Sequence, residues 1–151
     1  MVERTNPYAA APEMLRAWEA FTLLIEHSGL ERSLLDLVKI RASQINACAN
    51  CLNMHTASAR KNGETEQRIH LLAAWQEAPC YAPRERAALA WTDHLTQIST
   101  RRAPQKVFDA LAAQFSPEEQ VKLTLAVNVI NSWNRLALGF GLFIPDLGWG
   151  K

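Results

Sequence analysis

The last predicted helix, 117–138, constrains the fold of this chain more than any other segment. It opens with Ser116-Pro117-Glu118-Glu119, which is a capping box with a proline at the first helical position. A helix that is apolar nearly all round needs partners on all sides, some of them from another subunit, so we expect a homo-oligomer. The apolar residues that cover most of its circumference are Val121, Leu123, Leu125, Ala126, Val127, Val129, Ile130, Trp133, Leu136 and Ala137.

The remaining segments also predict helices. Apolar residues recur at helical spacing, and glycine and proline residues mark the ends and starts of these stretches. No strand pattern and no internal repeat is visible. We therefore expect an all-α fold, a single-domain helical bundle of about six to seven helices over 1–151, with its core at 12–138 and an apolar C-terminal arm at 139–151. The predicted helices span 12–28, 34–45, 48–61, 64–75, 83–95, 104–115 and 117–138.

Charge and hydropathy narrow the function classes. Sixteen basic and fifteen acidic residues leave a formal charge of +1, which favours neither a nucleic-acid partner nor an acidic membrane surface. No stretch approaches the roughly 20 apolar residues that a membrane span requires. The N-terminus has an early acid and no apolar segment, so it does not resemble a secretory signal. We expect a cytoplasmic protein, in whose compartment thiols are kept reduced and a close cysteine pair is typically catalytic or metal-binding.

A cysteine pair with a histidine carries the chemistry. Cys48-Ala49-Asn50-Cys51 is followed by His55, which lies one helical turn beyond Cys51 on the same face. The cluster places a nucleophile, a resolving thiol and a base within reach of one another. Cys48 lies near the expected start of a helix, where unpaired amides and the helix dipole favour a thiolate.

The spacing also assigns roles to the two thiols. His55 is one turn from Cys51 but nearly two from Cys48, so we expect His55 to activate Cys51, either by taking its proton or by stabilising its thiolate as an imidazolium. In a peroxidase, the Cys51 thiolate attacks the peroxide and becomes a sulfenic acid. Cys48 then condenses with it to a disulfide and releases water.

Other interpretations of these residues stay open. Two cysteines and a histidine supply three ligands for zinc, but no fourth ligand is evident nearby. The pair is alternatively structural. Haem attachment is excluded because Leu52 stands where the histidine would have to be. The third cysteine, Cys80, is most simply a small apolar residue in a connection between helices.

One acid and three further histidines complete the candidate list. Asp36 precedes Cys48 by twelve residues, and a short loop near Asn46 would fold its helix back so that it faces the thiols. By itself, an acid at a helix start is typical of a surface residue that compensates the helix dipole. The other histidines have no cysteine nearby and are expected at the surface or in packing; they are His27, His70 and His94.

The run 37–56, Leu-Val-Lys-Ile-Arg-Ala-Ser-Gln-Ile-Asn-Ala-Cys-Ala-Asn-Cys-Leu-Asn-Met-His-Thr, resembles the carboxymuconolactone decarboxylase superfamily. The pattern C-x-x-C-x-x-x-H is that of its alkyl hydroperoxidase D-like branch. Similar residues continue through 57–63, 73–75, 85–91 and 131–135, so the resemblance covers most of the chain.

The resemblance implies an all-helical domain that assembles into dimers, trimers or hexamers and acts as a dithiol peroxidase or disulfide reductase. It places peroxide attack on Cys51, resolution on Cys48 and a proton relay on His55 and Asp36. Two departures bear on this relay. Asp36 stands where the family has a glutamate, and Asn50 stands where a histidine or an aromatic residue is common. The decarboxylase branch lacks the cysteine pair, which argues against lactone chemistry.

The leading hypothesis is therefore a thiol-dependent alkyl hydroperoxidase, an antioxidant enzyme with a Cys48/Cys51 dithiol–disulfide cycle. Its partners would be a hydroperoxide substrate and an external dithiol reductant, for example a lipoyl-type protein. No nucleotide or flavin motif is present, so no cofactor is expected. The alternatives are a disulfide reductase or adapter for a partner peroxidase, and a non-catalytic helical assembly that binds a metal or ligand.

Overall fold

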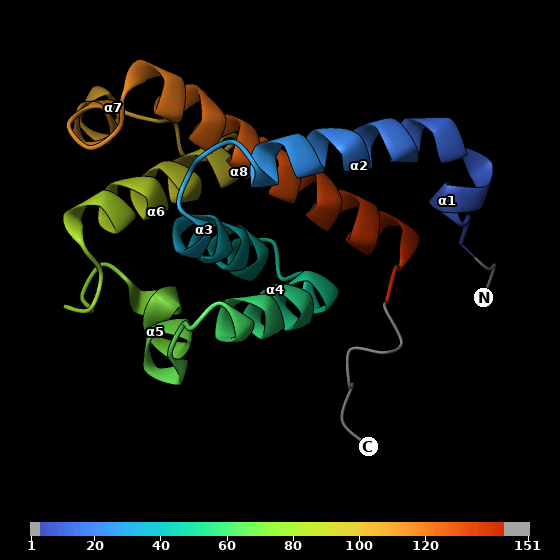
Figure 1. Cartoon of the computed structure of the whole chain (residues 1–151), viewed down its shortest axis with the longest axis horizontal. Helices are drawn as coiled ribbons and strands as arrows, with labels where there is room; N and C mark the ends of the chain where they lie inside the picture. Colours follow the sequence, from blue (N-terminus) through green and yellow to red (C-terminus); the bar gives the residue numbers. More distant parts are fainter. Residues whose placement is uncertain (1–3, 144–151) are drawn as a thin grey trace.

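The computed structural model describes residues 4–143. Within this part of the chain it contains eight α-helices, one 3₁₀ turn and no strand (Figure 1). The prediction of an all-α fold is therefore confirmed. The elements are α1 (Pro7–Ala10), α2 (Pro12–Glu26), α3 (Arg32–Ile45), α4 (Ala49–Lys61), α5 (Glu66–Leu71), the 3₁₀ turn η1 (Leu72–Ala74), α6 (Pro83–Thr96), α7 (Gln105–Ala112) and α8 (Pro117–Phe140).

Helix α3 lies near the centre of the bundle. It contacts α4 on one side and α6 and α8 on the other (Figure 1). Its apolar residues point in several directions. Leu35 belongs to an apolar cluster that it forms with residues of α8, whereas Leu37 belongs to a second cluster, which includes residues of α5 and η1. Both side chains are completely buried. Burying one such side chain contributes about 2 kcal/mol, so α3 links the two halves of the core.

Helix α8 has many partners, as its sequence requires. It contacts α2, α3, α4, α6 and α7, and its side chains Leu123 and Val127 are completely buried. Three of its apolar residues are nevertheless exposed, Val121 to 59%, Leu138 to 48% and Phe140 to 36%. The expected homo-oligomer, which would cover such residues, stays a prediction.

The helix boundaries differ from the predicted ones at both ends of the chain. Helix α1 is an additional short helix, capped by the side chain of Asn6, whose Oδ1 accepts the Tyr8 amide at 3.0 Å. Helix α8 continues through Gly139 and ends at Phe140, where the C-cap Gly141 stops the helix with a φ of +65°. The predicted arm therefore begins two residues later, and its remainder, 144–151, lies outside the described residues.

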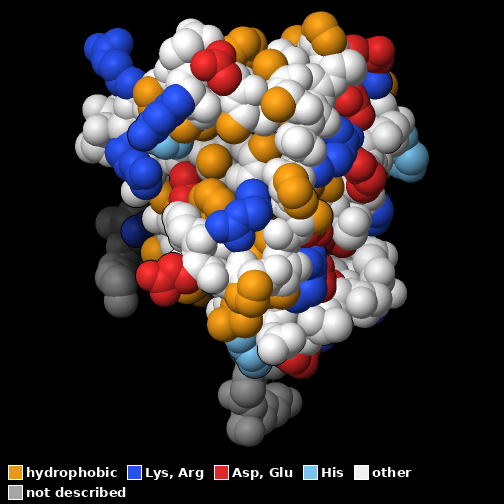
Figure 2. All heavy atoms as spheres, turned by 90° about the vertical axis from the view of Figure 1, so that its left-hand side faces the viewer, with side chains coloured by type: hydrophobic (Ala, Val, Ile, Leu, Met, Phe, Trp, Pro, Cys, Tyr) orange, Lys and Arg blue, Asp and Glu red, His pale blue; other side chains and the backbone are white. Residues whose placement is uncertain are grey.

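In the described part of the chain, no helix is long and apolar enough to cross a membrane. Figure 2 shows one face of the molecule, on which basic, acidic and apolar side chains are interspersed. On that face, charges of one sign therefore do not gather into a separate patch, in keeping with the small formal charge of +1.

Candidate active site

The cysteine pair lies in the first turn of α4, directly after a tight connection from α3. Helix α3 ends at Ile45, and Ala47 then adopts a φ of +54°, the only positive φ of a non-glycine residue in the described chain. Cys48 is the N-cap of α4: its amide donates to the Ser43 carbonyl at 3.0 Å, and its sulfur accepts the Cys51 amide at 3.4 Å. The expected position of Cys48 at a helix start is thus confirmed.

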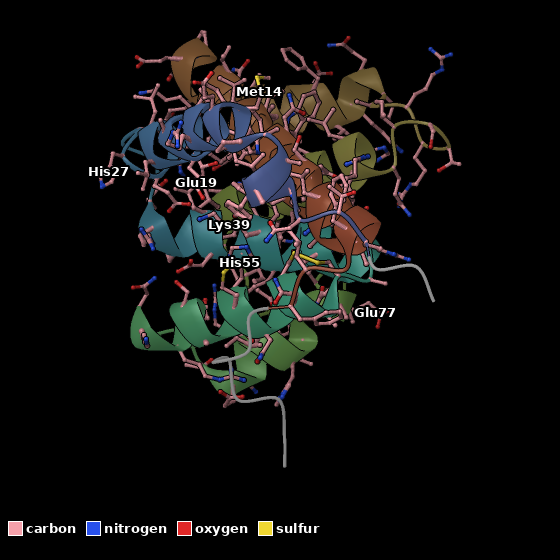
Figure 3. The ribbon with its side chains drawn as sticks, turned by 90° about the vertical axis from the view of Figure 1, so that its right-hand side faces the viewer. Met14, Glu19, His27, Lys39, His55 and Glu77 are labelled. Carbon is pink, nitrogen blue, oxygen red and sulfur yellow. A yellow bond between two sulfur atoms is a disulfide. The ribbon has the colours of Figure 1, made fainter. Side chains whose placement is uncertain are left out.

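Cys48 and Cys51 are joined by a disulfide in this structure (Figure 3). Their Cα atoms are 5.3 Å apart, within the usual range for a disulfide. Both residues are buried. The structure therefore represents the oxidised state of the pair.

An asparagine network ties this connection to α8. The Asn46 side-chain amide donates to Asn131 Oδ1 at 3.0 Å and to Asn134 Oδ1 at 2.8 Å, and Asn134 in turn donates to Ser43 Oγ at 3.1 Å. Asn131 and Asn134 are buried, so these bonds are shielded from water. The sequence offered one signal for this network, the asparagines that recur every three residues on α8, Asn128, Asn131 and Asn134, of which Asn128 is exposed.

One of the two cysteines lines a cavity of about 380 Å³. Cys51 lines it, whereas Cys48 is not among its lining residues. His55, four residues along α4, lines the same space, so the structure brings Cys51 and His55 to one cavity. The other lining residues are Tyr8, Glu19, Thr22, Glu26, Lys39, Asn50, Met54, Val129, Ile130, Trp133, Ala137, Leu142 and Phe143.

His55 is neutral in this environment. Burial, followed by the positive charges of Lys39 and Arg32, lowers the pKa of His55 to about 3. Figure 3 shows His55 and Lys39 next to each other on α4 and α3. In the oxidised state the imidazole is therefore available as a neutral hydrogen-bonding group, and the imidazolium expected as one alternative is disfavoured near neutral pH.

An ion pair that the sequence pattern did not reveal lies in the cavity wall. Lys39 Nζ donates to Glu26 Oε1, and both side chains are almost fully enclosed. Glu26 Oε2 lies 3.1 Å from Arg32 Nη1. Glu26 is the last residue of α2 and Lys39 is one helix further on, so only the tertiary fold brings them together.

Asp36 lies away from the cavity. It is buried on α3, and its Oδ2 accepts the side-chain amide of Asn62 at 2.6 Å. Asn62 caps the far end of α4, which is roughly 16 Å along the helix from Cys51. Asp36 is not among the residues that line the cavity with Cys51 and His55. Its Oδ1 has no hydrogen-bond partner among the described residues, so a water-mediated role of Asp36 stays a prediction.

The remaining candidates occupy ordinary positions. Among residues 4–143, no three histidine, cysteine or acidic side chains lie close enough together to hold a metal ion. His27 and His70 are exposed, while His94 is partly buried and lies 2.7 Å from the Arg102 carbonyl. Cys80 packs against the apolar cluster that includes residues of α5 and η1, as expected for a small apolar residue.

Comparison with known proteins identifies the family to which the cysteine segment belongs. The sequence model of the Carboxymuconolactone decarboxylase family matches residues 12–94, which include Cys48, Cys51 and His55. The uncharacterized protein YdfG of Bacillus subtilis is 41% identical over 141 residues, 93% of this chain and 96% of that protein. A protein of unknown function from Agrobacterium tumefaciens, suggested to be the antioxidant defence protein AhpD, has a crystal structure that matches with a TM-score of 0.90. It is 44% identical and covers 95% of this chain and 98% of its own.

A more distant structure has another activity. The debrominase Bmp8 matches with a TM-score of 0.82 at 18% identity, over 92% of this chain and 75% of its own. At this identity the likeness concerns the fold alone. It shows that this fold carries more than one chemistry, so the activity has to be argued from the site.

Proposed function

Since the chain belongs to the carboxymuconolactone decarboxylase family, we propose that it is a thiol-dependent hydroperoxidase with a Cys48/Cys51 dithiol–disulfide cycle. One observation carries this proposal: Cys51 lines the 380 Å³ cavity, while its disulfide partner Cys48 lies behind it at the N-cap of α4. A substrate in the cavity meets one thiol, and the second thiol is already within bonding distance of the first.

In the proposed cycle, the Cys51 thiolate attacks the terminal oxygen of the hydroperoxide. The O–O bond breaks, its electron pair leaves with the alkoxide, and a proton converts the alkoxide to an alcohol. The Cys48 thiol then attacks the sulfur of the Cys51 sulfenic acid, the disulfide forms, and the hydroxyl leaves as water with the Cys48 proton. The neutral imidazole of His55 lies at the same cavity, where it can pass a proton between these groups.

The walls of the cavity favour an organic hydroperoxide over hydrogen peroxide. Most of the side chains contributed by α8 are apolar, among them Ile130 and Trp133, and Met54 adds a further apolar wall. Apolar side chains bind the carbon skeleton of a substrate and exclude water from its reacting end. The volume of about 380 Å³ accommodates a small organic molecule.

The disulfide has to be reduced from outside, and we propose a dithiol such as a lipoyl-type protein. A vicinal dithiol that enters the cavity attacks the sulfur of Cys51 and then closes its own disulfide, which regenerates both thiols. If this second half-reaction is fast and the peroxide half is slow, the protein is instead a disulfide reductase that serves a separate peroxidase.

Thiol titration of the reduced protein tests the proposal. One equivalent of tert-butyl hydroperoxide should remove two thiols and two mass units, located by peptide mass spectrometry to the segment that holds Cys48 and Cys51. The Cys51→Ser variant should consume no peroxide, whereas Cys48→Ser should stop at a sulfenic acid. Cys80→Ser, a change outside the cavity, is the matched control and should behave as the wild type. Thiols that stay free in the wild type, or equal turnover in both single variants, would refute the peroxidase cycle.

A further inference from the structure

The Glu26–Lys39 ion pair has an unusual position for a structural contact. Both side chains line the cavity that contains Cys51, although each is almost fully enclosed. Taking two charges out of water is unfavourable unless other hydrogen bonds compensate the loss. Among the described residues, Lys39 Nζ has one recorded acceptor, Glu26 Oε1, although an ammonium carries three donors. Hydrogens of this ammonium therefore remain for a group inside the cavity.

The buried ion pair between Arg41 and Asp93 is built differently. Asp93 accepts from Arg41 at 2.6 and 3.0 Å, from Trp75 at 3.2 Å and from Gln76 at 3.2 Å. Each of its carboxylate oxygens is satisfied, and neither Arg41 nor Asp93 lines the cavity. The Arg41–Asp93 pair thus has the properties of a structural contact, while the Glu26–Lys39 pair lines the same cavity as Cys51.

His55 does not supply a positive charge here, because burial and the charges of Lys39 and Arg32 lower its pKa to about 3. Asp36, the acid expected to assist it, is bound to Asn62 away from the cavity. The positive group that lines the cavity with Cys51 is Lys39.

We propose that Lys39 is the cationic acid of this site, which stabilises the Cys51 thiolate and donates the proton to the departing alkoxide, and that Glu26 is the residue that positions it. This inference rests on the proposed hydroperoxidase function. Glu26 acts through Lys39 and not on the substrate.

The proton balance closes over one cycle. The Cys51 thiolate and the Lys39 ammonium react with the hydroperoxide: the S–O bond forms, the O–O bond breaks, and the alkoxide takes a proton from Lys39. The products are a sulfenic acid, an alcohol and a neutral amine. Cys48 then closes the disulfide and releases water. After the external dithiol has reduced the disulfide, the Cys51 thiol gives its proton to the Lys39 amine, and both charges are restored.

Several charged or titratable groups face this site and set its pH response. Helix α2 contributes Glu19 and Glu26, α3 contributes Lys39 and Arg32, and α4 contributes His55. From α1 comes Tyr8, whose pKa is raised by burial and by the Glu19 carboxylate. The residues of α8 that line the cavity carry no charge: Val129, Ile130, Trp133 and Ala137.

The first test uses no peroxide. In a Cys48→Ser, Cys80→Ser background, the rate at which iodoacetamide alkylates Cys51 is measured from pH 4 to 10. Lys39→Met keeps the length of the side chain but removes its charge, so we expect the midpoint to rise and the rate at pH 7 to fall about tenfold. Lys39→Arg keeps the charge and should largely restore the rate. The matched control is Lys122→Met, which removes a lysine that is paired with Glu118 on α8 away from the cavity.

The second test measures proton donation. The rate of sulfenic acid formation with tert-butyl hydroperoxide is divided by the thiolate fraction from the alkylation profile. Lys39→Met should still be about 100-fold slower than the wild type on this scale, because the alkoxide then lacks its acid. A Lys39→Met variant that matches the wild type in both tests overturns the inference.

Misfolding of the variant and an unreactive wild type are two further outcomes of these tests. Should Lys39→Met fail to fold by circular dichroism, the double variant Glu26→Gln/Lys39→Met, which leaves no unpaired buried charge, replaces it with the same expected losses. Should the wild type fail to react with the hydroperoxide, the proposed function and the proton-donor role both fall. The alkylation profile then still decides whether Lys39 stabilises the thiolate.

Discussion

Among the single residues that the structure describes, Ala47 is the one other than glycine with a positive φ. Its φ of +54° brings an L-side chain into the left-handed region, and this conformation turns the chain from α3 into the N-cap at Cys48. Such a conformation costs about 1 kcal/mol for a residue other than glycine. The strain is sustained by bonds on either side of it, from Cys48 to Ser43 and from Asn46 to α8.

We therefore predict that Ala47→Gly stabilises the oxidised protein. Glycine adopts this φ without steric cost, and the gain should be up to about 0.5 kcal/mol after its larger unfolded-state entropy is deducted from the strain that is relieved. Urea unfolding measures the difference. Ala20→Gly on the exposed face of α2 is the control, and should lose about 1 kcal/mol because the same substitution lies inside a helix. Equal losses in both variants would show that Ala47 is not strained.

The buried His55 should make the stability of the protein depend on pH. Its pKa is lowered to about 3 in the folded protein, first by burial and then by Lys39 and Arg32, while an unfolded histidine titrates near its ordinary value of 6.5. Between these values the unfolded state binds the extra proton, so the free energy of unfolding should fall as the pH falls. The slope for one such group is at most about 1.4 kcal/mol per pH unit.

Urea unfolding between pH 6.5 and 5 checks this, because few carboxyl groups titrate in that window. The His55→Gln variant lacks the buried base and should show a flatter dependence than the wild type. Two-dimensional NMR of the oxidised protein provides a second measurement. The His55 imidazole signals should stay those of the neutral ring down to pH 5, in contrast to a histidine-containing peptide in the same buffer.

Among the elements, the connection between α3 and α4 depends on α8. Asn134 is completely buried, accepts from Asn46 and donates to Ser43, so it fixes both the end of α3 and the approach to Cys48. Asn134→Ala would leave Ser43 and part of Asn46 without their partners. We predict a loss of about 2 kcal/mol in the free energy of unfolding.

Asn128→Ala provides the comparison, since Asn128 is exposed on the same helix and should change stability by no more than about 0.5 kcal/mol. Chemical unfolding of both variants in the oxidised state gives the two values. A loss at Asn134 as small as the one at Asn128 would mean that the network does not hold the connection.

The elements also show which features the sequence makes predictable. Helix starts and stops depend on neighbouring residues, and so the capping box at Ser116 is found at its expected place. Gly63, with its positive φ, follows the end of α4, in line with the expectation that glycine residues mark helix ends. Helix α1 was missed because four residues are too few for a periodic pattern. The end of α8 was placed too early because Gly139 is tolerated inside the helix, whereas Gly141 has the positive φ that ends it.

The residues of the candidate site likewise separate into those that local sequence predicts and those that it does not. Cys48, Cys51 and His55 belong to one helix and its N-cap, so their proximity follows from spacing. Glu26 and Lys39 meet across two helices, and no local pattern joins them. Asp36 was expected at the thiols from its place in the motif, but the packing of α3 on α4 directs it to Asn62. Contacts between elements are what the sequence does not reveal by itself.

For the whole molecule, the exposed apolar residues of α8 support the prediction of a homo-oligomer. Leaving Val121 at 59% and Leu138 at 48% exposure keeps apolar surface in water that a second copy would cover. We predict that the protein forms a dimer, trimer or hexamer of its 16.9 kDa chain. Size-exclusion chromatography with light scattering measures the mass, and it should fall to that of the chain only on strong dilution.

Charge substitutions then test whether α8 is the covered helix. A lysine at a contact buried between subunits loses its hydration without gaining a partner, so Val121→Lys or Leu138→Lys should raise the dissociation constant by about tenfold or more. Asn128→Lys adds the same charge at an exposed polar position of the same helix and should leave the mass unchanged. If all three variants keep the wild-type mass, these residues lie outside the contact. If the wild type has the mass of one chain at every concentration, the predicted oligomer is wrong, and α8 satisfies its apolar faces within a single subunit.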